Sequence, residues 1–113
     1  MGKKPERQDL LPGTLDMLIL KSLSLGVMHG YGIAQHIRNV SGEVLHVEEG
    51  SLYPALQRLQ LQGLIASEWG QSANNRRARY YRLTRAGRKQ FVRATSKWER
   101  FAAAMRRVLA AEG

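Results

Sequence analysis

Apolar residues recur at helical spacing between positions 14 and 25. The stripe consists of Leu15, Leu18, Ile19 and Leu23, widened by Met17 and Leu20. A helix that is apolar on most of its sides is normally buried inside the fold. Thr14 is a suitable N-cap for this helix, and Gly26 is expected to end it.

The pattern beyond this helix predicts a second helix and a short strand. Ile33, Ile37 and Val40 stand at helical spacing, and Gly42 follows them as the expected stop. The segment EVLHV, residues 43–47, alternates between apolar and polar positions, which is typical of a strand.

A third helix is predicted within residues 47–65, VEEGSLYPALQRLQLQGLI, and Gly63 is expected to close it. Its apolar side consists of Leu52, Ala55, Leu56 and Leu59. Pro54 is expected in the first turn, where a proline removes no helical hydrogen bond. The other side has no acid after Glu49 and consists of Ser51, Tyr53, Pro54, Gln57, Arg58, Gln60 and Leu61. Since a solvated helix face usually mixes Glu with Lys, this side favours a partner that repels acids.

Two extended runs, at 64–69 and 79–84, predict a β-hairpin whose turn centres on Asn74 and Asn75. The basic tip consists of Arg76, Arg77 and Arg79, which stand beside Asn74 and Asn75. Such a cluster contributes sequence-independent, salt-sensitive affinity for phosphates. The alternative is an ordinary solvated turn, because exposed turns are often charged.

A long final helix is predicted from Thr84 to about Ala111, with Gly87 as its weak point. Its apolar residues follow one another by 3, 4, 3, 4 and 3 positions, at Phe91, Ala94, Trp98, Phe101, Met105 and Val108. This heptad seam is typical of helices that pair. Such a helix runs roughly 40 Å, too long for a small domain to cover. Part of the seam must pack on the first helix, and a second chain is expected to cover residues 101–109.

Composition narrows the class of protein. The 113 residues suffice for one domain with a modest core. Eighteen Lys and Arg against nine Asp and Glu give a formal net charge of +9, which favours nucleic acid as partner before an anionic membrane surface. There is no cysteine, so disulfides and thiolate metal sites are excluded. Without a bilayer-spanning run or a secretory signal, a cytoplasmic location and no membrane partner are expected.

No catalytic or metal-binding constellation stands out, and no cofactor is predicted. His29, His36 and His46 lack the spacing of metal ligands. The Gly-Tyr-Gly at 30–32 is not followed by the Lys-Ser/Thr of a phosphate loop. Since no nucleophile is paired with a base either, an enzyme is not expected.

The order of elements predicts a mainly α fold with a small β-hairpin, which is a winged helix-turn-helix followed by a long C-terminal dimerisation helix. Residues 1–9 are expected to form a flexible basic arm, 10–84 the DNA-binding domain and 85–113 the dimerisation helix. In this architecture the third helix lies in the major groove and the hairpin reaches the backbone or minor groove.

Contact with DNA explains why the outer side of the third helix has no acid after Glu49. Phosphates repel carboxylates, and base edges need hydrogen-bond donors and acceptors. Gln pairs well with adenine and Arg with guanine. The residues expected to contact DNA are Ser51, Tyr53, Pro54, Gln57 and Arg58 from the helix, with Asn75, Arg76, Arg77 and Arg79 from the hairpin.

Four segments resemble the PadR-like family of bacterial winged-helix transcriptional regulators. They are LPGTLDMLILKSL, HGYGIAQHI, EEGSLYPALQRLQLQGLI and NNRRARYYRLTRAGRKQF. The similarity runs from about Leu10 to Phe91 and is specific only when the motifs are taken together. It implies a homodimeric repressor that binds a palindromic operator of nearby transport or detoxification genes. It also implies dimerisation through the first helix, including Leu15, and the C-terminal helix.

The chain resembles the short members of the family, which end in a single helix and lack the longer C-terminal domain of the phenolic-acid-responsive members. In multidrug-responsive short members, a tryptophan of that helix lines a pore between subunits and stacks planar drugs. Trp98 falls at a comparable point, so a small aromatic effector is a candidate ligand there. The alternative for Trp98 is packing in the core or interface.

Two rival functions remain open. One is a winged-helix module that binds DNA without sequence preference or binds another protein. The other is a membrane-surface protein that uses the cationic final helix. Specific binding to DNA upstream of the chain's own gene, poorly competed by random DNA, distinguishes a transcription factor from both.

Overall fold

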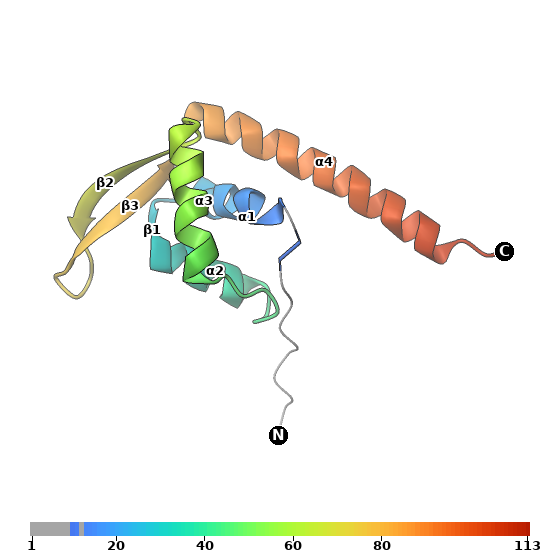
Figure 1. Cartoon of the computed structure of the whole chain (residues 1–113), viewed down its shortest axis with the longest axis horizontal. Helices are drawn as coiled ribbons and strands as arrows, with labels where there is room; N and C mark the ends of the chain where they lie inside the picture. The colour runs from blue at the N-terminus through green and yellow to red at the C-terminus, as the bar shows by residue number, and fades with distance from the viewer. Residues whose placement is uncertain (1–9, 12) are drawn as a thin grey trace, which may run out of the picture.

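The computed structural model describes residues 10, 11 and 13–113, so the arm expected at 1–9 lies outside the described residues (Figure 1). The elements are α1 (Thr14–Ser24), β1 (Met28–His29), α2 (Gly30–Val40), α3 (Glu49–Leu61), β2 (Ile65–Gln71), β3 (Arg77–Leu83) and α4 (Arg85–Ala110). The predicted mainly α fold with a small sheet and a long C-terminal helix is confirmed.

Three helices and one face of the sheet enclose the core. The largest fully buried apolar side chains are Ile19, Leu20, Ile33, Leu52, Leu56, Leu59 and Ile65. They come from α1, α2, α3 and β2, and include members of all three predicted helical stripes. Val40 is the exception to these stripes, since its side chain is 73% exposed at the end of α2.

The sheet has three antiparallel strands in the order β1-β3-β2, and the predicted hairpin is confirmed as β2 and β3. The strand expected at 43–47 is wrong, because that segment contributes only an isolated bridge at Leu45. Gly42 and Glu43 both adopt a left-handed φ, of 64° and 65°, and turn the chain after α2. Val47 is buried in the core. The segment therefore places Val47 in the core and does not form a strand. The strand that pairs with the free edge of β3 is β1, which the sequence did not predict.

The ends of the first two helices differ in how they are capped. Gly13, with a left-handed φ of 83°, occupies the N-cap of α1, so the prediction of Thr14 as cap is wrong. The Thr14 hydroxyl instead donates to the Leu11 carbonyl at 2.7 Å. At α2, His29 is the N-cap, and its Nδ1 accepts from the Gly32 N–H at 2.8 Å.

Helix α3 ends as predicted but tolerates its proline for another reason. Gly63, at φ 75°, follows the C-cap, and the Leu64 N–H donates to the Leu59 carbonyl at 3.0 Å in a Schellman arrangement. Pro54 stands in the second turn, so its predicted place in the first turn is wrong. A proline there leaves the carbonyl four residues earlier unpaired. That residue is Gly50, which is exposed to solvent.

The junction between α3, the sheet and α4 is built on Thr84, the N-cap of α4. Its hydroxyl donates to the Gly63 carbonyl at 2.7 Å and accepts from the Gly87 N–H at 3.0 Å, and its own N–H donates to the Leu64 carbonyl at 3.1 Å. Gly87 is buried here, and a Cβ would overlap the Leu64 carbonyl oxygen and the Leu83 side chain. Gly87 is therefore a site of close backbone approach, and its description as a weak point is wrong.

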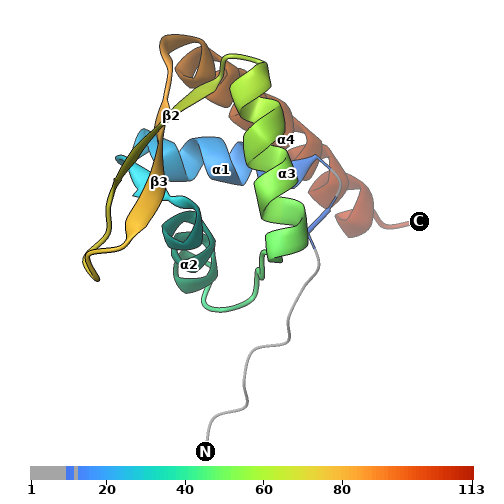
Figure 2. The same cartoon turned by 60° about the vertical axis from the view of Figure 1, so that its left-hand side comes forward.

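Helix α4 leaves this junction, passes along α1 and continues beyond the rest of the molecule (Figure 1). The molecule measures 59 × 43 × 22 Å, with the hairpin tip and the end of α4 at opposite ends of its long dimension. In the view from another side, α3 crosses the front of the body (Figure 2). In the part of the chain that the structure describes, no helix combines the length and apolarity needed to cross a membrane.

Replacement of Gly87 by alanine is predicted to destabilise the protein. The added methyl must displace backbone that Thr84 holds in place, and overpacking of this kind costs about 1–3 kcal/mol or more. Urea unfolding at a fixed protein concentration measures the change. Gly50→Ala is the matched control, because Gly50 also lies in the first turn of a helix but faces open space. We expect Gly50→Ala to be neutral or stabilising by up to about 1 kcal/mol; equal effects of the two substitutions would contradict the close-approach account.

Candidate nucleic-acid interface

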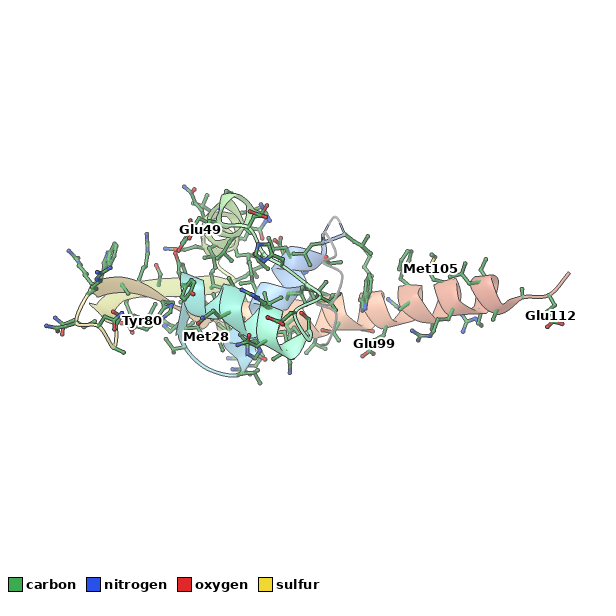
Figure 3. The ribbon with its side chains drawn as sticks, turned by 90° about the horizontal axis from the view of Figure 1, so that it is seen from below. Met28, Glu49, Tyr80, Glu99, Met105 and Glu112 are labelled. Carbon is green, nitrogen blue, oxygen red and sulfur yellow. The ribbon has the colours of Figure 1, made fainter. Side chains whose placement is uncertain are left out.

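Helix α3 separates its residues into a buried and an exposed side, as the sequence predicted. The four residues of its apolar stripe, Leu52, Ala55, Leu56 and Leu59, are each 1% exposed and face the core, whereas Leu61 is 82% exposed. The exposed side carries Ser51, Tyr53, Pro54, Gln57 and Arg58, all five of the residues predicted to contact DNA from this helix. Viewed from below, α3, marked by Glu49, projects from the layer that contains the hairpin and α4 (Figure 3). This position makes its exposed side accessible to a large partner.

Arg58 is held by an ion pair that the sequence did not reveal. Its Nη2 donates to the Asp16 carboxylate of α1, and the two side chains are 51% and 34% exposed. A guanidinium has five N–H donors, so this pair leaves others available. Because the pair fixes the guanidinium beside α1, contact of Arg58 with a guanine must coexist with this pair or replace it.

Tyr53 is half exposed and lies over the start of α2. A Cβ at Gly30 would stand 3.0 Å from the Tyr53 ring, so a glycine permits this approach. Tyr81 is buried beneath this region, and burial raises the pKa of its phenol. The nearby Tyr53 adds to the rise and the charge of Arg79 opposes it, so Tyr81 is neutral at pH 7.

The hairpin tip is a short, exposed turn. Asn75 adopts the left-handed conformation expected of a turn residue, with φ 58°, and its N–H donates to the Ser72 carbonyl at 2.9 Å. The Ser72 N–H in turn donates to the Arg76 carbonyl at 2.8 Å. The side chains of Asn75 and Arg76 are therefore presented at the far end of the hairpin, as predicted.

Arg77 and Arg79 share one face of the hairpin with Trp69. The strand register pairs Trp69 with Arg79 and Gln71 with Arg77, and residues two apart on a strand share a face. The guanidinium carbon of Arg77 lies 4.5 Å from the centre of the Trp69 ring, and that of Arg79 lies 5.8 Å from it. Trp69 is 57% exposed, so these arginines stack on an indole at the surface.

A chain of side-chain hydrogen bonds connects this face to α3. The Arg79 Nε donates to the Ser67 hydroxyl at 2.8 Å, and that hydroxyl donates to Gln60 Oε1 at 3.1 Å. Gln60 was predicted on the outer side of α3 without a role, and Ser67 and Trp69 were not predicted as site residues. The register of the two strands could have found them, because it places both residues on the face of Arg79.

The predicted dimerisation residues divide into two groups. Leu15 and Phe91 are partly buried and pack against the core of their own chain, where the Lys21 ammonium lies 5.9 Å from the centre of the Phe91 ring. Farther along α4 the same seam is open, with Phe101 54%, Met105 45% and Val108 73% exposed.

Ala94 and Trp98 lie between these groups and line a groove of about 570 Å³ between α1 and α4. Its other lining residues include Met17, Gln90, Lys97 and Phe101. The rings of Trp98 and Phe101 lie 6.0 Å apart, centre to centre. The groove is therefore largely apolar, with the cationic Arg93 and Lys97 at its wall.

The fold agrees with comparisons to known proteins. The family model described as the transcriptional regulator PadR-like family matches residues 19–93. The chain belongs to this family. The resemblance expected from its motifs is thereby confirmed, and this PadR-like protein is a transcriptional regulator and not an enzyme.

Solved structures of PadR-like regulators superimpose well on this chain. A transcriptional regulator from Clostridium thermocellum is 33% identical, with a TM-score of 0.77 over 84% of this chain and 92% of that one. A PadR family regulator from Clostridium difficile R20291 is 30% identical, with a TM-score of 0.76 over 87% of this chain and all of that one (100%). Bacillus subtilis PadR in complex with operator DNA shares the fold, at 23% identity and a TM-score of 0.65 over 73% of this chain and 47% of that one.

Proposed function

We propose that this PadR-like regulator binds double-stranded DNA as a homodimer, recognises a palindromic operator and represses nearby transport or detoxification genes in the cytoplasm. The observation that carries the DNA part is the hydrogen-bonded link between the exposed side of α3 and the arginine face of the hairpin. It holds the acid-poor exposed side of α3 and the basic face of the hairpin in a fixed mutual position. Bacillus subtilis PadR, which shares this fold, has been crystallised with operator DNA.

In this proposal residues 10–84 form the DNA-binding unit, and α3 enters the major groove. Gln57 is the best candidate for reading a base, because it is exposed on α3 and an amide pairs well with adenine. Arg58 contributes a second base contact only with the donors that its pair with Asp16 leaves available. Ser51, Tyr53 and Pro54 flank these residues and contact the sugar-phosphate backbone, with the N-terminal amides of α3 pointing toward a phosphate.

The hairpin supplies affinity that does not depend on sequence. Arg76, Arg77 and Arg79 project from it and neutralise phosphates beside the groove that α3 occupies, and the neutral Asn75 amide donates a hydrogen bond to a phosphate beside them. Each phosphate so neutralised releases counterions, so binding weakens as salt rises. The formal net charge of +9 acts in the same direction by steering the protein toward DNA.

Residues 85–113 form the dimerisation unit in this proposal. The exposed stretch from Phe101 to Leu109 gives α4 an apolar stripe that its own chain does not cover. A second copy is the occupant that fits, because two α4 helices can bury identical heptad seams against each other. Figure 3 shows Met105 on the side of α4 toward which α3 projects, opposite Glu99. A two-fold dimer would present two α3 helices, and a palindrome matches that symmetry.

A small aromatic effector is a second element of the proposal, and the groove beside Trp98 favours it. The groove is large enough for a drug-sized molecule, since ligand pockets measure about 300–1,000 Å³. Its lining offers the indole of Trp98, which is 36% exposed, and the flexible side chain of Met17. Planar compounds suit such a wall because they stack on an indole.

Variants of the two DNA-binding elements are predicted to behave differently. Arg76→Ala with Arg77→Ala should weaken binding to all duplex sequences by a similar factor and lower the salt slope by about 0.9 for each lost phosphate contact. Gln57→Ala should instead reduce discrimination between the DNA upstream of the gene and random duplex, by about 1–3 kcal/mol. Fluorescence anisotropy titrations across a salt series measure both.

Arg106→Ala with Arg107→Ala is the control, because it removes the same charge near the end of α4. It should leave the salt slope nearer to that of the wild type. If Gln57→Ala leaves discrimination intact while the hairpin variant abolishes it, the assigned roles are reversed. A wild type that binds upstream and random DNA equally would support the non-specific alternative.

The dimer proposal predicts that the protein sediments as a dimer at micromolar concentration in analytical ultracentrifugation. Phe101→Glu with Met105→Glu places like charges in the seam and should yield monomers that lose binding to the palindrome. Val92→Glu with Ser96→Glu adds the same charge on the opposite side of α4, where both residues are exposed, and should leave the dimer intact. A monomeric wild type would refute the proposal.

The effector proposal predicts that planar cationic or aromatic compounds quench Trp98 fluorescence and loosen operator binding. The titration uses a Trp69→Phe background so that Trp98 is the emitting indole. Trp98→Ala should abolish the effect of the compounds on operator binding and keep the dimer. Absence of quenching by a broad panel of planar compounds, or dissociation of the Trp98→Ala dimer, would assign Trp98 to structure alone.

A further inference from the structure

Trp69 is an unusual residue to find at the surface of the hairpin. It is 57% exposed, it does not belong to the core, and neither the α3 contacts nor the basic tip requires an indole at this position. The face on which it lies changes character along its length. Near α3 the face carries Ile65 and Tyr81, which are buried, and toward the tip it carries Trp69, Arg79 and Arg77.

The contacts of Trp69 are with arginines that the proposed function assigns to DNA. Arg77 and Arg79 both stack within 6 Å of the indole centre, at 4.5 Å and 5.8 Å. Arg76, the neighbouring arginine of the same tip, lies in the turn that precedes β3 and does not belong to this stack. The tip of the hairpin therefore holds arginines of two kinds, two supported by an indole and one presented by the turn alone.

We propose that Trp69 is a positioning residue of the DNA interface, which holds Arg77 and Arg79 in the conformations that contact DNA phosphates. The Ser67 link to Gln60 extends this support, so that the stacked arginines keep a fixed position relative to α3. The inference rests on the proposed DNA-binding function and deepens it, because it names the residue that orders the hairpin side chains before DNA arrives.

The geometry of the guanidinium group explains why an indole suits this task. A guanidinium that stacks through its flat face keeps its in-plane N–H donors free for phosphate oxygens. A long side chain that is already ordered also loses less conformational freedom when it binds. Arg79 is ordered twice, by the indole and by the bond from its Nε to Ser67, which leaves its terminal nitrogens for the partner.

The test measures binding of the full-length protein to a random-sequence duplex, since the hairpin contribution does not depend on sequence. Trp69→Leu keeps an apolar side chain but removes the aromatic face. It should weaken binding roughly three- to tenfold at low salt, as expected when one long side chain must be ordered on binding. Trp69→Phe keeps a smaller aromatic face and should lose less. The salt slope should fall in Trp69→Leu, which a purely structural role of Trp69 would not cause.

Double-mutant cycles identify the partners of Trp69. In an Arg77→Ala, Arg79→Ala background, Trp69→Leu should have no further effect, because the side chains that it supports are gone. In an Arg76→Ala background it should have its full effect. Ser67→Ala should weaken binding in the same direction, whereas Ser96→Ala, an exposed serine on α4, should not.

Three results would overturn the inference while leaving the proposed function intact. The first is wild-type DNA affinity in Trp69→Leu, and the second is an equal loss of affinity in Trp69→Phe and Trp69→Leu. The third is a loss of affinity in Trp69→Leu that adds to the loss in the Arg77→Ala, Arg79→Ala variant, because additivity would mean that the indole touches DNA itself. A wild type that binds no duplex DNA would refute the proposed function together with the inference. If Trp69→Leu lowers the midpoint of thermal unfolding, Arg77→Lys with Arg79→Lys tests the same stack at constant charge. Unchanged DNA affinity in that double variant would then overturn the inference.

Discussion

The close contact between the start of α4 and the end of α3 is the constraint on which the arrangement of the molecule depends. Thr84 bonds the carbonyls of both Gly63 and Leu64, and Gly87 lets the helix backbone reach Leu64 without a side chain between them. Since β3 ends at Leu83 and α4 begins at Arg85, this one junction sets the direction of three elements. The hairpin, the exposed side of α3 and the long helix cannot be reoriented independently while it holds.

The two surfaces of the molecule obey different physical requirements. The proposed DNA-facing surface is polar and cationic, and its order comes from hydrogen bonds and stacking, as with Gln60, Ser67 and Trp69. The α4 surface is apolar, and only a second apolar surface can remove Phe101 and Met105 from water. In the proposed dimer, the separation of the two surfaces on different elements would let DNA binding respond to salt and dimerisation to protein concentration.

Periodicity was sufficient to predict most of the fold. The stripe Leu52, Leu56, Leu59 fixed the buried side of α3, and thereby its exposed side, because a helix with one apolar stripe has a single orientation against a core. Periodicity gave wrong predictions where contacts between distant parts of the chain determine the local structure. Residues 43–47 alternate like a strand, yet only Val47 is buried in the core. Gly87 looks like a weak point of its helix when read from the sequence alone, because the close approach of Leu64 is visible only in the structure. Met28 and His29 form a strand only because β3 offers them an edge.

The residues of the candidate site likewise divide into those that local pattern predicts and those that depend on contacts between distant positions. Residues exposed on one helix or at one turn, such as Gln57 and Arg76, could be identified from local pattern alone. The pair of Arg58 with Asp16 joins positions 42 residues apart, and no local pattern reveals it. The stack on Trp69 lies between these cases, because it requires the strand register but nothing more distant.

Helix α1 offers a physical route between the two surfaces. Asp16 bonds Arg58 on the exposed side of α3, and the next residue, Met17, lines the groove beside Trp98. Successive residues of a helix point about 100° apart, so α1 can face both surfaces at once. A molecule that entered the groove would contact α1. Any rotation of that helix would move the Asp16 carboxylate that holds Arg58. An effector can alter DNA binding only if its affinity differs between two positions of such an element. Such a coupling would be confined to α1 and would need no rearrangement of the hairpin, because the junction at Thr84 keeps α3 and α4 in their mutual position.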